Sequence, residues 1–338
     1  MTPRLHDDEL DVRDAVVRSL VDDHDPAWRG LPLRRVPSTG TDNVVYRLGD
    51  DLGVRVPRIG WAVAQVEREA RWLPLLASHL PCAVPAPVAV GEPGHGYPHR
   101  WLVFRWLPGR DLAHATSDPS TRPPVWWDDV AAGLGDVVSS LRAVDLPGAP
   151  AAGPRGGPLA PHDDGVRRLV AHVAALPGDR RLDAARATAV WEEALAASPW
   201  PHAPVWVHGD LLPGNVLVSD GCAEGRAAGG DVVGLIDWAA PGLGDPACDA
   251  MVAWALPARA REIFRERAGF DDATWTRARG WVIQQALAFI PYYRTTLPDA
   301  VEGAWRRLAA VLEEPTGRAR VDRRGGSSLP SGECRHAR

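Results

Sequence analysis

Three polar residues, Asp210, Asn215 and Asp237, stand beside short apolar runs in a pattern that could hold a metal ion. Asp210 follows one such run, and Asn215, five residues later, precedes the run 216–218. Asp237 ends a further apolar run, 232–236. Two strands separated by a turn pair as a hairpin. We therefore expect all three polar side chains to meet at one end of that hairpin.

These residue types suit a magnesium ion that assists phosphoryl transfer. Mg²⁺ prefers one or two carboxylates together with phosphate oxygens and water. Phosphoryl transfer needs such an ion to neutralise charge, and a carboxylate to orient the attacking hydroxyl. An Asp followed five residues later by an Asn is also the spacing of the kinase catalytic loop. A helix cap and a turn residue in a structural hairpin are the plain alternative, but order, spacing and strand context together favour the catalytic interpretation.

The segment 208–215 reads His-Gly-Asp-Leu-Leu-Pro-Gly-Asn and, with Ile236-Asp237-Trp238, resembles the aminoglycoside phosphotransferase family, the kinase-like antibiotic phosphotransferases. The resemblance implies that Asp210 is the catalytic base and that Asn215 and Asp237 bind Mg²⁺. It also implies that His208 braces the loop through hydrogen bonds.

A second segment, Gly244-Asp245-Pro246 followed by Asp249, looks like the stretch that comes after the metal-binding Asp in this family. There the second Asp is structural and anchors the catalytic loop, which is the role that the resemblance implies for Asp249. For Asp245, a plain N-cap ahead of Pro246 is an equally good interpretation.

The family places a basic residue, commonly lysine, on the third strand, where it contacts the α- and β-phosphates of the nucleotide. Arg55 is the match here, because the chain contains no lysine and all 38 basic residues are arginine. Arginine is always charged and can hold phosphate oxygens with two donors. On the following helix, Glu69 is the expected ion-pair partner of Arg55, and Glu67 is the alternative. An ordinary surface pair of little value is the plain interpretation.

The remaining nucleotide contacts are also carried over from the resemblance. The loop with Ser38 and Thr39 takes the place of the phosphate-covering loop, although an ordinary turn explains it equally well. In the connector 104–109, the carbonyl group of Arg105 and the amide group of Leu107 are expected to contact adenine. A simple interlobe linker is the alternative there.

Apolar patterning predicts a strand-rich first third and a helical remainder. Strands are expected at 33–37, 43–48, 52–57, 101–106, 205–207, 216–218 and 232–236. Helices are expected at 8–22, 62–78, 126–144, 163–175, 183–197, 246–256, 258–268, 273–290 and 299–313. The aromatic-rich stretch 281–293 has the spacing typical of a buried helix face and is interpreted as core.

Composition excludes several classes of function. The formal charge of −5 gives no basic footprint for nucleic acid. No run approaches a membrane span, and the charged N-terminus has no apolar signal core. The four cysteines form no CxxC pair, so we expect free thiols in a reducing cytoplasm.

The expected fold is α+β and protein-kinase-like, with a small β-rich N-terminal lobe and a larger helical C-terminal lobe. We expect a nucleotide-binding lobe at 1–105, a catalytic and acceptor-binding lobe at 106–314, and a disordered tail at 315–338. The expected activity is transfer of the γ-phosphoryl group of ATP, with Mg²⁺, to a hydroxyl of a small molecule, first of all an aminoglycoside or related antibiotic. A metabolite kinase and a nucleotide-binding pseudokinase are the alternatives, and the oligomeric state is left open.

Overall fold

The smaller lobe is built on a five-stranded antiparallel sheet in the order β1-β2-β3-β5-β4. The computed structural model describes residues 9–37, 42–219, 230–238 and 241–315. The strands of this sheet are β1 (Leu33–Arg35), β2 (Asn43–Leu48), β3 (Leu52–Pro57), β4 (Pro87–Gly91) and β5 (Trp101–Arg105). The turn between β2 and β3 contains Gly49 at φ 59°, a conformation that glycine adopts without steric cost.

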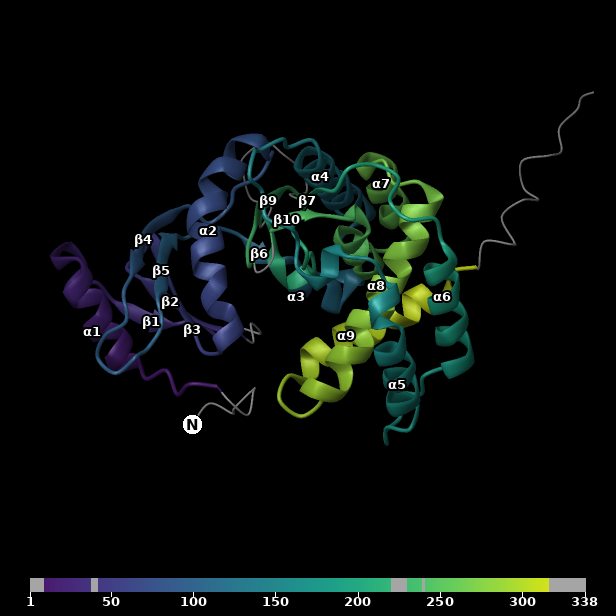
Figure 1. Ribbon diagram of the computed structural model, residues 1–338, viewed down its shortest axis with the longest axis horizontal. Helices are drawn as coiled ribbons and strands as arrows, with labels where there is room; N and C mark the ends of the chain where they lie inside the picture. Colours follow the sequence, from purple (N-terminus) through teal and green to yellow (C-terminus); the bar gives the residue numbers. More distant parts are fainter. Residues whose placement is uncertain (1–8, 38–41, 220–229, 239–240, 316–338) are drawn as a thin grey trace, which may run out of the picture.

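Two helices cover the sheet, one on each face. Val17, Leu20 and Val21 of α1 (Asp14–His24) belong to a buried cluster that includes Tyr46 and Trp101. Val66 of α2 (Val63–Leu76) packs with Leu102 and Phe104 in a separate cluster. Figure 1 shows α2 between the sheet and the larger lobe. The helix therefore lies where its side chains can reach both lobes.

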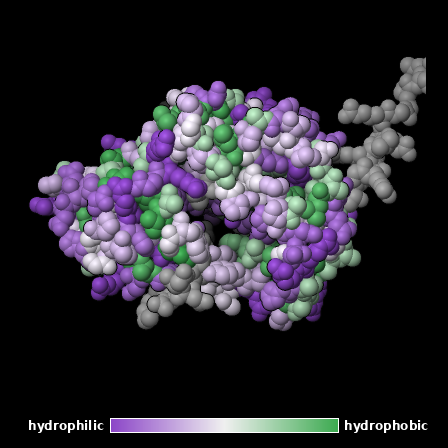
Figure 2. All heavy atoms as spheres, viewed as in Figure 1, coloured by the Kyte–Doolittle hydropathy of each residue, from purple (hydrophilic) through white to green (hydrophobic). Residues whose placement is uncertain are grey.

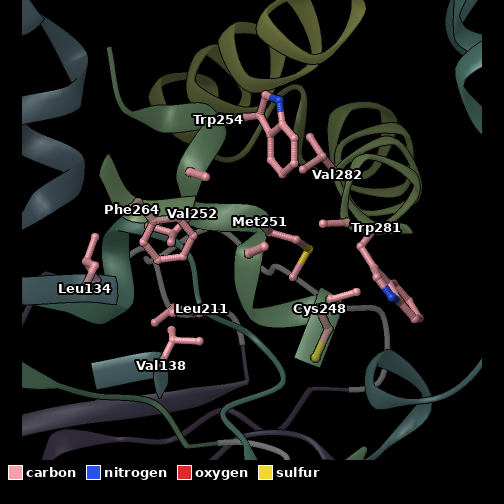
Figure 3. Close-up of a cluster of buried hydrophobic side chains, with 14 of the residues drawn as sticks. Leu134, Val138, Leu211, Cys248, Met251, Val252, Trp254, Phe264, Trp281 and Val282 are labelled. Atoms are coloured by element: carbon pink, nitrogen blue, oxygen red, sulfur yellow. The ribbon is translucent and has the colours of Figure 1, made fainter. Parts of the chain in front are cut away.

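The larger lobe is mainly helical. Its helices are α3 (Leu112–Ser117), α4 (Pro124–Arg142), α5 (Asp163–Ala174), α6 (Ala184–Ala196), α7 (Ala258–Ala268), α8 (Asp272–Tyr293) and α9 (Pro298–Glu313). They surround a large core in which Cys248, Met251 and Trp254 come from the 3-10 helix η8 (Pro246–Ala255). Figure 3 shows these side chains packed between α4, α7 and α8. Leu211 of the catalytic loop joins the same cluster, which fixes that loop to the core.

The catalytic segment is carried by two small sheets. One has the order β6-β8-β9, from β6 (Arg110–Asp111), β8 (Val216–Val218) and β9 (Val232–Leu235), and the other pairs β7 (Val205–Val207) with β10 (Gly242–Gly244). The expected hairpin is confirmed, because β8 and β9 are antiparallel. The backbone of Ala83 bonds to β9 through two hydrogen bonds of 3.0 Å, to Val233 and Leu235, and so joins the segment between the lobes to this hairpin.

Three expectations about elements need correction. Strand β4 was not expected, because Pro85 and Pro87 indicate a break; Pro87 is tolerated as the first residue of an edge strand. Residues 246–255 form a 3-10 helix rather than an α-helix. The first helix begins at Asp14, not at residue 8. The expected tail, 315–338, lies outside the described residues except for Pro315. Within the described part of the chain, no helix is long and apolar enough to span a membrane.

Candidate active site

The catalytic loop is held by a buried carboxylate from η8. Asp249 is almost fully buried and accepts the backbone N–H groups of His208 (2.7 Å) and Gly209 (2.9 Å). Gly209 has φ 79°, so the turn requires a glycine there. Burial raises the pKa of Asp249, while His208 and the two N–H groups lower it again. Asp249 therefore lies where the sequence expectation puts an anchor for the loop.

His208 connects this loop to the strand that carries Asp237. Its ring Nε2 donates to the carbonyl oxygen of Ile236 (3.0 Å), and Nδ1 accepts the backbone N–H of Asp210 (3.3 Å). The ring is fully buried, and burial lowers its pKa. A neutral imidazole with one donor and one acceptor nitrogen fits both bonds. The expected bracing hydrogen bonds are thus present.

The side chain of Asp210 faces a pocket and forms an ion pair with Arg155. Arg155 lies in the short 3-10 helix Pro154–Gly156, far from the catalytic loop in sequence. Burial raises the pKa of Asp210, and the Arg155 guanidinium lowers it. A raised pKa makes a carboxylate a better proton acceptor while it remains ionised at neutral pH.

Asn215 and Asp237 present oxygen atoms suited to Mg²⁺. The side-chain nitrogen of Asn215 donates to the carbonyl oxygen of Asp210 (2.8 Å), which leaves its amide oxygen for another partner. Asp237 has φ 60°, a left-handed conformation that is strained for a non-glycine residue and is often found at functional sites. One carboxylate oxygen of Asp237 accepts a hydrogen bond from the side chain of Gln65 (2.9 Å). Asn215 and Asp237 line the same pocket as Asp210. A free amide oxygen and a carboxylate fit a magnesium ion that is completed by phosphate and water.

A buried polar network joins the smaller lobe to Asp237. Arg55 forms an ion pair with Glu69, and its Nη1 lies 3.9 Å from Asp237 Oδ1. Burial alone lowers the pKa of Arg55, but Glu69 and Asp237 raise it above its usual value, so the guanidinium stays charged. Arg55 Nε and Glu69 Oε2 are buried without a hydrogen-bond partner. Glu67, the alternative partner, pairs instead with Arg100 at the surface.

Gln65 lies at the centre of this network. It is 3% exposed; its side-chain nitrogen donates to Glu69 (3.1 Å) and Asp237, and its oxygen accepts from Asn43 (3.0 Å). The backbone N–H of Trp238 also donates to Glu69 (3.2 Å). The helix of the smaller lobe is therefore bonded directly to the segment that carries Asp237.

Of the other residues predicted to contact the nucleotide, the structure describes Arg105 and Leu107. Arg105 ends β5, and the next backbone N–H, of Trp106, donates to Asp51 (2.8 Å), so Arg105 and Leu107 lie where the chain leaves the sheet. Ser38 and Thr39 lie outside the described residues.

A pocket of about 670 Å³ opens in front of Asp210. It is lined by Asp111, Ala113, His114, Thr116, Ser117, Asp210, Leu212, Pro213, Gly214, Asn215, Asp237, Gln285, Phe289, Asp299, Ala300, Glu302, Gly303, Arg306 and Arg307. Figure 2 shows the molecule hollowed near its middle, between the two lobes. The lining comes mostly from α3, α8, α9 and the loop 210–215, so Asp210 forms one wall and the late helices form the other.

Comparison with known proteins was made for sequence and for structure. Residues 34–281 match the phosphotransferase enzyme family, APH, which is well over half of the chain. The chain belongs to this family. No curated protein sequence matches it significantly.

Solved structures of phosphotransferases share the fold. The GDP and kanamycin complex of APH(2")-IIIa has a TM-score of 0.65 and 17% identity, over 87% of this chain and 97% of that one. The macrolide 2'-phosphotransferase MphH from Brachybacterium faecium has a TM-score of 0.52 and 24% identity, over 88% and 99%. The gentamicin complex of APH(2")-IIa has a TM-score of 0.57 and 14% identity, over 90% and 98%. The kinase-like, two-lobed α+β fold is thereby confirmed, and the phosphotransferase family makes the chain a small-molecule kinase.

Sequence reasoning missed four polar residues of this phosphotransferase site. Gln65 sits one helical turn before Glu69, a spacing that could have drawn attention to it. Arg155 falls in a Pro/Gly-rich stretch without any pattern. Gln285 was placed in the core but lines the pocket, and Arg307 of α9 was not singled out. Contacts between distant segments carry no local sequence signal, which explains these omissions.

Proposed function

We propose that this phosphotransferase uses ATP and Mg²⁺ to phosphorylate a hydroxyl of an aminoglycoside or a related antibiotic. The observation that carries the proposal is the common pocket onto which Asp210, Asn215 and Asp237 open. A base and two oxygen ligands on one wall are what in-line transfer of a γ-phosphoryl group needs.

In the proposed mechanism, Asp210 orients the acceptor hydroxyl and accepts its proton while the hydroxyl oxygen bonds to the γ-phosphorus. The bond between that phosphorus and the bridging oxygen breaks, and ADP leaves. Asn215 and Asp237 would hold Mg²⁺, which when bound would supply positive charge to offset the charge developing on the phosphoryl oxygens. His208 and Asp249 keep Asp210 in place through the bonds described above.

The donor half of the reaction is assigned to the smaller lobe, residues 1–105, and acceptor binding to 106–314. Arg55, positioned by Glu69, contacts the α- and β-phosphates. Ser38 and Thr39 contact the outer phosphates, and the Arg105 carbonyl and Leu107 amide groups contact adenine. The ion pair between Arg55 and Glu69 supports this assignment. A buried guanidinium without a charged partner is costly, and Glu69 is the partner that holds this one in the cleft.

The acceptor class rests on two observations. Similar structures are named for complexes with kanamycin and gentamicin. The lining of this pocket also includes Asp111, Asp299 and Glu302, and carboxylates suit the ammonium groups of an amine-bearing acceptor. We place the protein in the cytoplasm, where ATP is supplied.

A single screen tests the proposal: release of the nucleoside diphosphate, ADP from ATP or GDP from GTP, is measured with and without aminoglycosides, macrolides, amino alcohols and amino sugars. Antibiotic-dependent ADP release is expected. Turnover with metabolites alone would make the chain a metabolite kinase. Nucleotide binding without turnover on any acceptor would make it a pseudokinase and would overturn the proposal.

A further inference from the structure

Arg307 differs from the other buried arginines of the described chain. Six arginines are at most 9% exposed: Arg55, Arg58, Arg261, Arg277, Arg279 and Arg307. Each of the first five has a carboxylate within 4.0 Å, from Glu69, Glu9, Glu314, Asp245 and Glu193 respectively. Arg307 is 8% exposed and has no carboxylate partner among the described residues. Burying a charge without an opposite charge is expensive, so this exception needs an explanation.

The hydrogen bonds of Arg307 are equally incomplete. A guanidinium group has five N–H donors. In the described chain, Arg307 uses Nη2 to donate to the side-chain oxygen of Gln285 (3.0 Å), and its Nε is buried without a partner. Burial lowers the pKa of Arg307 to about 10, with Asp210 opposing the change, so the group is still charged at neutral pH. A neutral amide oxygen does not balance that charge.

The unpaired guanidinium lies at the acceptor pocket. Arg307 and Gln285 both line it, from α9 and α8. Gly303, one turn earlier on α9, also lines the pocket, and Arg307 Nη1 would lie 3.7 Å from a Cβ placed on it. No side chain at Gly303 therefore separates the guanidinium from the pocket. Asp210 lines the same pocket, so the proposed base and this cation face one cavity.

We propose that Arg307 and Gln285 form an oxyanion subsite in the acceptor pocket. Resting on the phosphoryl transfer of the proposed function, this revises the preferred acceptor from an aminoglycoside, which carries no oxyanion, to a hydroxylated amine that also carries a carboxylate or a phosphate group. The hydroxyl meets Asp210, the ammonium meets the carboxylates of Asp299 and Asp111, and the oxyanion meets the fork of Arg307. A planar guanidinium binds such groups through two parallel hydrogen bonds.

The first test measures anion binding without turnover. The melting temperature is followed as sodium acetate replaces sodium chloride at constant ionic strength, with saturating Mg²⁺ and ADP so that acetate cannot occupy the nucleotide phosphate positions. We expect a rise of roughly 2 °C or more for the wild type and for the control Arg294→Met, since ligand binding stabilises the folded state. Arg307→Met should show no rise, and Arg307→Lys should show a smaller one. Equal responses of the wild type and Arg307→Met would overturn the subsite.

The second test compares three amino sugars as acceptors of the unmodified protein: glucosamine, muramic acid, which adds a carboxylate, and glucosamine 6-phosphate. We expect kcat/KM for one of the two anionic sugars to exceed that for glucosamine by at least tenfold, and the better of the two identifies the oxyanion. In Arg307→Met the preference should vanish through KM of the anionic sugar, with KM for ATP unchanged. Glucosamine equal to or better than both would contradict the subsite.

The two tests separate this inference from the proposed function. ADP release with neutral or cationic acceptors, together with no acetate effect, would leave the kinase assignment intact and remove the oxyanion subsite. Acetate stabilisation that depends on Arg307, together with no turnover on any acceptor, would keep the subsite and remove the kinase proposal.

Discussion

Buried charges are balanced differently in two regions, the proposed donor side of the cleft and the proposed acceptor pocket. On the donor side, Arg55, Glu69, Gln65 and Asp237 contact one another in one network. In the acceptor pocket, Arg307 is buried beside a neutral Gln285. The contrast indicates that the protein itself completes the donor side, whereas the acceptor side is completed by a bound molecule.

The largest expected effect is the loss of turnover when Asp210, on one wall of the pocket, is replaced. Asp210→Asn removes the proton acceptor but keeps the shape of the side chain, so kcat should fall by roughly 10²- to 10⁴-fold. The melting temperature should change little, because Asp249 and not the Asp210 carboxylate holds the loop. Steady-state ADP release on the best acceptor measures the effect. Turnover close to that of the wild type would remove Asp210 from its assigned role.

The comparison can be tested by replacing one buried arginine that is paired with a carboxylate and one that is not. Arg277 is bidentate to Asp245, at 2.6 and 3.0 Å, and that carboxylate also caps η8. Arg277→Met leaves the Asp245 side chain, which is 14% exposed, without its charged partner, so the free energy of unfolding should fall by about 3 kcal/mol. Arg307→Met removes a charge that has no carboxylate partner and should leave stability equal or higher. Urea denaturation of the ligand-free proteins measures both; equal losses would erase the distinction.

A smaller effect is expected within the donor network. Gln65→Leu removes both hydrogen bonds that join Glu69 to Asp237, together with the bond that Gln65 accepts from Asn43. Hydrogen bonds to charged groups contribute about 1.5–3 kcal/mol each, so KM for ATP and Mg²⁺ should rise by roughly tenfold or more. KM for the acceptor should stay the same. Gln284→Leu, on α8 but outside the pocket lining, is the matched control.

The smallest expected effect concerns pH. His208 is buried and neutral, with its pKa lowered by burial. Below the unfolded-state pKa of about 6.5, the unfolded chain binds a proton that the folded chain refuses, so folding stability falls as the pH falls. The loss has an upper limit of about 1.4 kcal/mol per pH unit. His208→Gln should lose stability less steeply between pH 7 and pH 5; parallel curves would show that the ring titrates normally.

Sequence reasoning recovered the parts of the site that local chemistry specifies. Asp210, Asn215 and Asp237 stand at fixed offsets from apolar strands, and the bounds of β2 and β3 follow from alternation and a Gly-Asp-Asp turn. The preference for Glu69 over Glu67 agrees with the ion pairs, because only Glu69 lies on the helix face toward Arg55. The roles of these residues stay predictions.

The rest depends on contacts between distant segments. Gln65 and Asp237 are separated by 172 residues. Arg307 stands out only in the structure, where the five other buried arginines of the described chain each have a carboxylate partner and Arg307 has none. Strand β4 was hidden by its prolines, which an edge strand tolerates. The 3-10 form of η8 was invisible because its buried, apolar residues favour a helix of either kind.

Arg55 has one practical consequence. Amine-reactive reagents acylate the neutral amine of a lysine side chain, and this chain has no lysine side chain at all. Such reagents would therefore find no lysine amine in the cleft, whether or not a nucleotide is bound. The same fact makes Arg55→Lys attractive, because the variant would carry one lysine amine, placed beside Glu69 and Asp237. Acylation of that single amine, and its loss when ATP is present, would report whether the nucleotide site is occupied.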